Sequence, residues 1–205
     1  MHALIASNPR AVIEACPQEL FTAAGYPETV TTTARTIQSG APNVKRVLVT
    51  GMSGTGKSSL LHELAGRGYR TADTDYGDYF QVTDGERLWC EDRVSSLLSS
   101  APDELPGVLF VQGTTRNQVL FYPRFHHIVL LSAPPEILAE RLATRTTNPY
   151  GKDPAQLAET LHYQQTVEPL LRASATLEVI TTVPVARVAD IVLDHVLGTR
   201  PTEQS

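Results

Sequence analysis

The chain has 205 residues, of which 41% are hydrophobic and 19% are charged, and its formal net charge is −5 at pH 7. This length suits one well-buried domain with an appendage, and the charge balance disfavours broad electrostatic binding to nucleic acid or to an anionic membrane. No apolar run reaches the length of a membrane span, and the amino terminus lacks the pattern of an export signal. The two cysteines, Cys16 and Cys90, have no paired spacing. We therefore expect a cytoplasmic protein with reduced thiols and without a nucleic-acid or membrane partner.

Residues 1–43 differ in composition from the rest of the chain. A short helical pattern, broken at Pro17, precedes a stretch rich in Thr with Gly and Pro. We therefore expect an N-terminal extension over residues 1–43, a main domain over residues 44–200 and a tail over residues 201–205.

From residue 44 onward, short apolar runs alternate with helical patterns. The expected strands are Val47–Thr50, Arg70–Asp73, Val108–Val111, Ile128–Leu131 and Leu177–Ile180. The expected helices are Lys57–Ala65, Glu86–Ser100, Pro134–Arg145, one capped by Asp153, and Pro184–Leu197. Most of these strands are apolar throughout, as is typical of parallel strands with helices on both faces. The alternation predicts a doubly wound α/β sheet, and ligands bind such sheets at the carboxyl ends of the strands.

The segment after the first strand has the pattern of a phosphate-binding loop. Gly51, Gly56, Lys57 and Ser58 fit G-x-x-x-x-G-K-S between a predicted strand and a predicted helix. Glycines allow the backbone to turn tightly, so that successive N–H groups and the helix amino terminus face an anion. We expect Lys57 to reach the β- and γ-phosphates, Ser58 to ligate Mg²⁺ and Ser59 to contact the α-phosphate. The residues expected to bind the nucleotide are Gly51, Ser53, Gly54, Thr55, Gly56, Lys57, Ser58 and Ser59. The sequence thus predicts ATP as cosubstrate and Mg²⁺ as the metal.

An acidic pair stands at the end of the second strand. Asp73 and Asp75 are two residues apart, so the period of a strand points both side chains to the same side. A carboxylate at this place can orient an acceptor hydroxyl and receive its proton, and a neighbouring one can hold the water shell of Mg²⁺.

With these motifs in hand, the chain resembles the small-molecule kinases of the nucleoside monophosphate kinase superfamily, and most of all the branch of shikimate and gluconate kinases. The matching segments are Gly51–Ser59, Asp73–Asp75, Gln112–Thr114 and the arginine-rich stretch from Arg141. The resemblance covers roughly residues 44–197 and implies a parallel sheet of five strands in the order 2-3-1-4-5, with a mobile lid at about residues 145–153.

The resemblance also assigns roles on the acceptor side. It gives Asp75 to the acceptor hydroxyl and Asp73 to the water shell of the metal. It places a substrate arginine early in the next helix, where Arg87 and Arg93 are both candidates. Shikimate kinases carry a run of glycines after the third strand, whereas this chain has "QGTTRNQ". We therefore expect an acceptor pocket that differs from theirs, with contacts from Gly113, Thr114, Arg116 and Asn117.

Two further arginines lie just before the expected lid and at its start. Arg141 and Arg145 are four residues apart, on one face of a helix. They resemble the lid arginines of such kinases, which clamp phosphates and stabilise the charge of the transfer. We expect both to be catalytic and Arg141 to bind the nucleotide as well.

The leading interpretation is an ATP-dependent kinase, a monomer or homodimer, that phosphorylates a hydroxyl of a small metabolite, sugar acid or natural product. One alternative is a nucleoside monophosphate kinase, since Arg87, Arg93, Arg116 and Arg124 offer charges for an acceptor phosphate. A second alternative is a nucleotide-binding module without phosphotransfer. The third strand ends in Gln112 rather than in an acidic residue, which disfavours an ATPase that activates water.

Overall fold

The computed structural model describes residues 44–100, 107–146, 148 and 150–198. The elements in chain order are β1 (Lys45–Thr50), α3 (Lys57–Gly66), β2 (Arg70–Asp73), β3 (Phe80–Thr83), β4 (Glu86–Trp89), α4 (Glu91–Ser99), β5 (Val108–Gln112), the 3₁₀ helix η1 (Arg116–Arg124), β6 (His127–Ser132), α5 (Pro135–Thr144), α6 (Pro154–Thr166), α7 (Glu168–Ser174), β7 (Leu177–Ile180) and α8 (Val185–Leu197). The expected extension over residues 1–43 and the tail over 201–205 lie outside the described residues. Within the described ranges, we find no helix with the length and hydrophobicity that a bilayer span requires.

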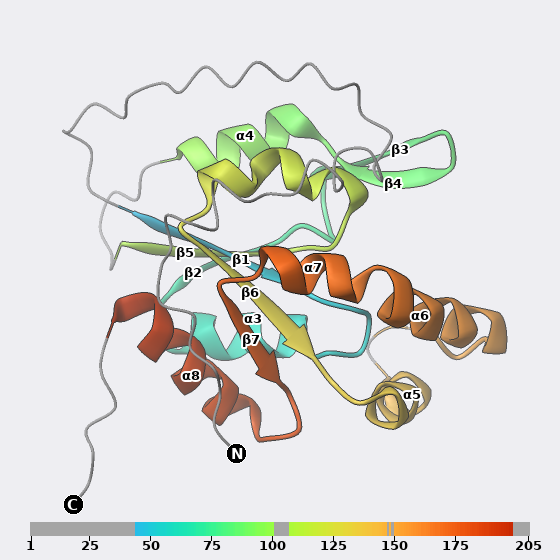
Figure 1. The fold of residues 1–205 in the computed structure, drawn as a ribbon. Helices are drawn as coiled ribbons and strands as arrows, with labels where there is room; N and C mark the ends of the chain where they lie inside the picture. Colours follow the sequence, from blue (N-terminus) through green and yellow to red (C-terminus); the bar gives the residue numbers. More distant parts are fainter. Residues whose placement is uncertain (1–43, 101–106, 147, 149, 199–205) are drawn as a thin grey trace, which may run out of the picture.

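Five parallel strands form the central sheet in the order β2-β5-β1-β6-β7 (Figure 1). When these five strands alone are numbered along the chain, their order is 2-3-1-4-5, which confirms the predicted P-loop kinase topology. The register places Val47 of β1 beside Phe110 of β5 on one side and His127 of β6 on the other. Because the strands are parallel, their carboxyl ends meet at one edge, and the loops after these ends share that edge.

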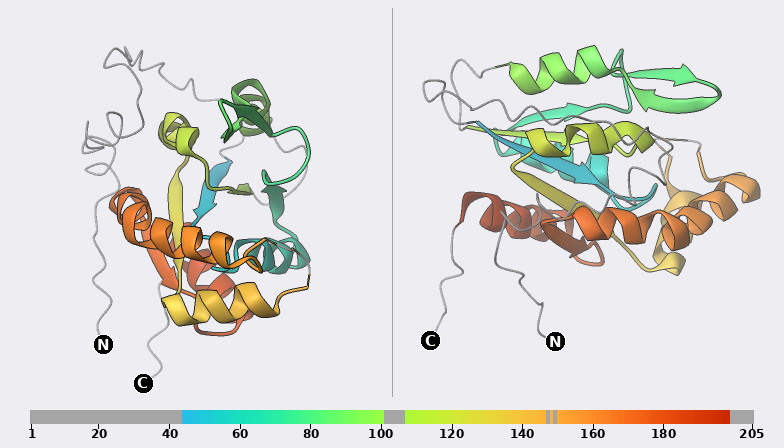
Figure 2. Two further views of the ribbon diagram at one scale, coloured as in Figure 1. Left: turned by 90° about the vertical axis from the view of Figure 1, so that its right-hand side faces the viewer. Right: turned by 45° about the horizontal axis from the view of Figure 1, so that its top comes forward.

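Helices cover both faces of the sheet, and alternate strand residues divide between them (Figures 1 and 2). Val47 and Val49 point to the face covered by α3 and α8, whereas Leu48 points to the face covered by α4 and η1. Both sets are fully buried. Full burial on two faces explains why β1, β5 and β6 are apolar almost throughout.

A β-hairpin replaces the first part of a predicted helix. The helix expected over Glu86–Ser100 begins only at Glu91, because Glu86–Trp89 pairs in antiparallel fashion with Phe80–Thr83. The turn of the hairpin is Asp84-Gly85, with φ of 53° and 79°. An Asp-Gly pair favours this left-handed turn, so the sequence did carry a hairpin signal. The prediction was wrong at this place because the apolar spacing further along the segment fits a helix.

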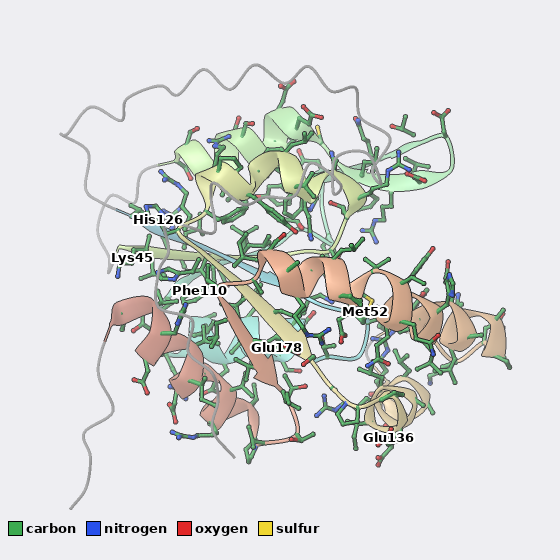
Figure 3. The ribbon with its side chains drawn as sticks, in the orientation of Figure 1. Lys45, Met52, Phe110, His126, Glu136 and Glu178 are labelled. Atoms are coloured by element: carbon green, nitrogen blue, oxygen red, sulfur yellow. The ribbon has the colours of Figure 1, made fainter. Side chains whose placement is uncertain are left out.

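A pair of histidines packs together at the end of the sheet opposite the phosphate-binding loop. His127 lies edge to face against His195, with 5.0 Å between ring centroids. Figure 3 shows the neighbouring His126 and Lys45 at this end and Met52 at the other. Burial, together with the charges of His195, Lys45 and His126, lowers the pKa of His127 from 6.5 to about 4. His127 therefore binds a proton less readily in the folded protein than in the unfolded chain.

This difference predicts a loss of stability in acid. Between pH 6.5 and pH 4 the unfolded state binds more protons at His127, so the free energy of unfolding falls as the pH falls through this window. His127 is only half-buried, and after allowance for solvent screening we expect a loss of about 1 kcal/mol between pH 7 and pH 5. His127→Gln should therefore reduce the drop in melting temperature over this range by about 3 °C. Thermal melts at both pH values check this, with the exposed His162→Gln as control. An equal drop in wild type and His127→Gln would contradict the prediction.

Candidate active site

The loop from Gly51 to Gly56 connects β1 to α3 at the carboxyl edge of the sheet. Gly51 has φ of 143°, and a Cβ atom there would lie 2.2 Å from the carbonyl oxygen of Leu131. Only glycine fits this close approach between β1 and β6. The Thr55 hydroxyl closes the turn by donating to the carbonyl of Met52 at 2.8 Å, so the side chain of Thr55 supports the loop from inside.

Lys57 begins α3 and bends back over the loop. Its Nζ donates to the carbonyl oxygens of Gly51 at 2.7 Å and Met52 at 3.1 Å. Burial lowers the pKa of Lys57, and the carboxylates of Asp75 and Asp73 act in the opposite direction. The ammonium group thus lies within electrostatic range of both acidic residues that the sequence singled out.

The acidic pair faces the start of α3. Asp73 ends β2, and its Oδ1 accepts the backbone N–H of Asp75 at 3.0 Å. Its Oδ2 accepts the hydroxyl of Ser58 at 3.5 Å. The Ser58 hydroxyl and the Asp73 carboxylate therefore form an oxygen-rich pair beside the loop, and such a donor set fits Mg²⁺.

The two arginines predicted for the lid lie at the end of α5. Arg141 donates to the carbonyl oxygen of Gly54 at 3.4 Å and to the hydroxyl of Thr181 at 2.9 Å. Arg145 donates to the carbonyl of Tyr150, and burial lowers its pKa. Arg145 also acts electrostatically on Lys57. Both guanidinium groups thus lie near the phosphate-binding loop. Of the expected lid, residues 147 and 149 lie outside the described residues.

One cavity of about 1650 Å³ joins these groups. This exceeds the roughly 300–1,000 Å³ of a site for one small molecule and leaves room for a nucleotide and an acceptor together. The predicted residues that line it are Gly51, Ser53, Gly54, Thr55, Gly56, Lys57, Ser58, Ser59, Asp75, Arg87, Thr114, Arg116, Arg141 and Arg145. Asp73 does not line the cavity, and its contact with the site is the hydrogen bond that it accepts from the Ser58 hydroxyl.

The arginines near the acceptor end separate into two groups. Arg87 lies over the ring of Phe80, 3.6 Å from its centroid, and donates to the carbonyl of Asp75. Arg116 forms an ion pair with Glu86 at 2.9 Å. Both line the cavity, whereas Arg93 is outside its lining, where it pairs with Asp78 on the surface. The structure thus favours Arg87 in the choice between Arg87 and Arg93 that the sequence left open.

Asn117 requires a correction. Its side chain is only 2% exposed, and its amide bonds to both backbone groups of Trp89: Oδ1 accepts the N–H at 2.9 Å and Nδ2 donates to the carbonyl at 3.0 Å. Both ends of the amide are occupied, so Asn117 fixes the end of β4 instead of contacting a ligand.

Gly113 and Thr114 support the site in different ways. A Cβ atom at Gly113 would lie 2.3 Å from the hydroxyl of Thr74 and 2.7 Å from the ring of Trp89, so glycine is needed where β5 passes these side chains. The Thr114 hydroxyl donates to the carbonyl of Gly51 at 2.9 Å and lines the cavity. Gly113 is therefore a packing residue, and Thr114 ties the end of β5 to the loop after β1.

The structure adds two residues to which the sequence assigned no contact in the site. Gln112 lies between Ser58 and Asp75, and Glu159 accepts hydrogen bonds from Tyr150 and Tyr163 on the wall of the cavity. For Gln112, its place at the end of the third strand was the one signal in the sequence. Glu159 had no such signal, because a polar residue on α6 has the pattern of a solvated helix face.

Comparison with known families and structures agrees with this fold. Residues 47–162 match the family model AAA_18, which is described as an AAA domain. A shikimate kinase from Acinetobacter baumannii in complex with shikimate superposes with a TM-score of 0.58 at 17% identity, over 78% of this chain and 97% of the kinase. At this identity the likeness shows the fold.

Two other kinases are similar at a lower level. A sugar kinase from Janibacter sp. HTCC2649 has a TM-score of 0.48 at 18% identity, over 77% of this chain and 96% of its own. A gluconokinase from Sinorhizobium meliloti 1021 has a TM-score of 0.48 at 20% identity, over 76% and 93%. No curated protein matches the sequence.

Proposed function

The chain belongs to the AAA_18 family of AAA domains and has a P-loop kinase fold, and from this premise we propose that it is an ATP-dependent kinase that phosphorylates a hydroxyl of a small metabolite, sugar acid or natural product. The observation that carries the proposal is the convergence of Lys57, Ser58 and Asp75 on one cavity that has room for two ligands. Mg²⁺, held beside Ser58 and Asp73, would neutralise phosphate charge.

In this proposal each residue has a part in positioning or charge neutralisation. Asp75 orients the acceptor hydroxyl and takes its proton as the oxygen bonds to the γ-phosphorus and the bond to the ADP oxygen breaks. Lys57 lies on the loop that binds the phosphates and neutralises charge on the group in transfer. Arg141 and Arg145 approach the same group from the end of α5.

A nucleoside monophosphate kinase is the second candidate, and the arginines weigh against it. An acceptor phosphate requires several guanidinium groups that converge on it. Arg87 and Arg116 line the cavity, but Arg93 is outside its lining, as is Arg124, which donates to the carbonyl of Ser95. Two arginines, one of them paired with an acid, suit a hydroxyl acceptor better than a phosphate.

The family description also suggests hydrolysis of ATP by an activated water. Such an ATPase usually places an acidic residue at the end of the strand that here ends in Gln112. An amide cannot take a proton from water, so this position favours transfer to an organic hydroxyl.

The test is a γ-phosphate transfer assay with ³²P-labelled ATP and Mg²⁺. Polyols, sugars and sugar acids form one panel of acceptors, and nucleoside monophosphates form the other. We expect labelled product from the first panel. Product from nucleoside monophosphates alone would replace the proposal with the second candidate. ATP binding without any transfer would indicate a nucleotide-binding module.

A further inference from the structure

Gln112 joins the two halves of the site. It is the last residue of β5, and its side chain is fully buried. Its Nε2 lies 3.3 Å from the Oγ of Ser58 and 3.4 Å from the Oδ2 of Asp75. An amide nitrogen carries two hydrogens, and each is directed to one of these oxygens. Gln112 thus bridges a predicted metal ligand and the predicted acceptor carboxylate.

Packing alone does not explain an amide at this position. The Oε1 of Gln112 is buried and has no hydrogen-bond partner among the described residues. A buried carbonyl without a partner destabilises the folded state, and an apolar side chain of similar size would avoid that loss. What the amide provides is its pair of donors to Ser58 and Asp75.

The hydrogen bonds of Ser58 show what these donors achieve. A serine hydroxyl has one hydrogen to donate and two lone pairs that accept. The hydrogen is directed to Oδ2 of Asp73, and one lone pair accepts from Gln112. One lone pair is therefore left for a cation. On the other side, Gln112 occupies Oδ2 of Asp75, which leaves Oδ1 for the acceptor hydroxyl.

We propose that Gln112 is a positioning residue that turns the hydroxyl of Ser58 toward the cation and fixes the carboxylate of Asp75 in the same network. This role rests on the proposed function, because it acts through the metal ligand and the acceptor carboxylate. A metal-bound group is oriented by its hydrogen-bond partners, and their removal usually weakens metal binding by about 10- to 100-fold.

Calorimetric titration of ATP with and without Mg²⁺ tests the role without any acceptor. Gln112→Leu keeps the volume of the side chain and removes both donors. We expect the gain in ATP affinity that Mg²⁺ brings to fall by about tenfold, while the affinity measured in EDTA changes by less than about twofold. We expect the melting temperature to stay the same or to rise, because the unpartnered carbonyl is gone.

Two companion variants separate positioning from packing. Ser58→Ala removes the ligand itself, so in the double variant Ser58→Ala/Gln112→Leu the second change should add nothing further to the loss. Val111→Ala truncates the neighbouring residue of β5, which faces the other side of the sheet. It should lower the melting temperature and leave the gain from Mg²⁺ intact.

The possible failures are distinct. If the wild type binds no ATP in the presence of Mg²⁺, the proposed function itself fails. If the wild type shows a gain from Mg²⁺ and Gln112→Leu retains all of it, or if the effects of Ser58→Ala and Gln112→Leu simply add, the positioning role is overturned and the proposed function stands.

Discussion

Replacement of Lys57 by alanine is expected to lower the rate of γ-phosphate transfer by about 10²- to 10³-fold. The ammonium group of Lys57 lies over the loop between Gly51 and Gly56, where it can neutralise charge on the phosphates. The measurement is the transfer assay at saturating ATP and Mg²⁺, combined with calorimetric titration of ATP. We expect the affinity for ATP to fall as well, because the same charge acts on the bound nucleotide.

The fold should survive this change. Burial already lowers the pKa of Lys57, so the charged group carries a desolvation cost in the folded state that alanine does not. We expect a melting temperature within a few degrees of the wild type. Lys45 offers the control for transfer, since Lys45→Ala removes the same charge at the opposite end of the sheet, where Lys45 donates to the carbonyl of Val196. A transfer rate in Lys57→Ala equal to that of the wild type would exclude the ammonium group of Lys57 from the reaction.

Replacement of Asp75 by asparagine is expected to separate chemistry from binding. Asparagine has nearly the same shape but cannot take a proton, so the transfer rate should fall by about 10²- to 10⁴-fold. The affinity for ATP should change little, because the contacts that hold the nucleotide come from the loop and from α3. The assay pairs single-turnover transfer with calorimetric titration, so that kcat and binding are read from the same preparations.

Asp78 provides the control for Asp75. It is exposed, it pairs with Arg93 on the surface, and neither residue lines the cavity. Asp78→Asn should therefore transfer phosphate at the wild-type rate. Full activity in Asp75→Asn would remove this carboxylate from the mechanism and leave the acceptor proton without its proposed base.

The sequence was most informative where structure depends on local pattern. The strands Arg70–Asp73 and Leu177–Ile180 have the predicted bounds, and Asp153 caps α6 by accepting the N–H of Ala155 at 2.8 Å. Both strands lie at the edges of the sheet and are only partly buried, so strand propensity specifies them within one short segment, as capping specifies a helix start. The phosphate-binding loop belongs to the same class, because the positive φ of Gly51 and Gly56 is a requirement on single residues.

The assignment of roles on the acceptor side depended on contacts between distant segments. Asn117 and Arg116 are neighbours in the sequence, yet one is fully occupied by Trp89 and the other lines the cavity. Arg87 was expected on a helix and lies on a hairpin strand instead. The role of each of these side chains is decided by its partner, and for Asn117 and Arg116 that partner is 28 and 30 residues away in the sequence.

The sequence by itself thus determined the strands of the sheet and a loop that fits a phosphate, because these depend on local backbone preferences and apolar periodicity. The order of the strands in the sheet followed from the family resemblance. Only the tertiary structure brought Gln112 between Ser58 and Asp75, over sequence separations of 54 and 37 residues. Parallel packing of β2, β5 and β1 carries the ends of these strands to one edge, and hydrogen-bond geometry at that edge is a property of the assembled sheet.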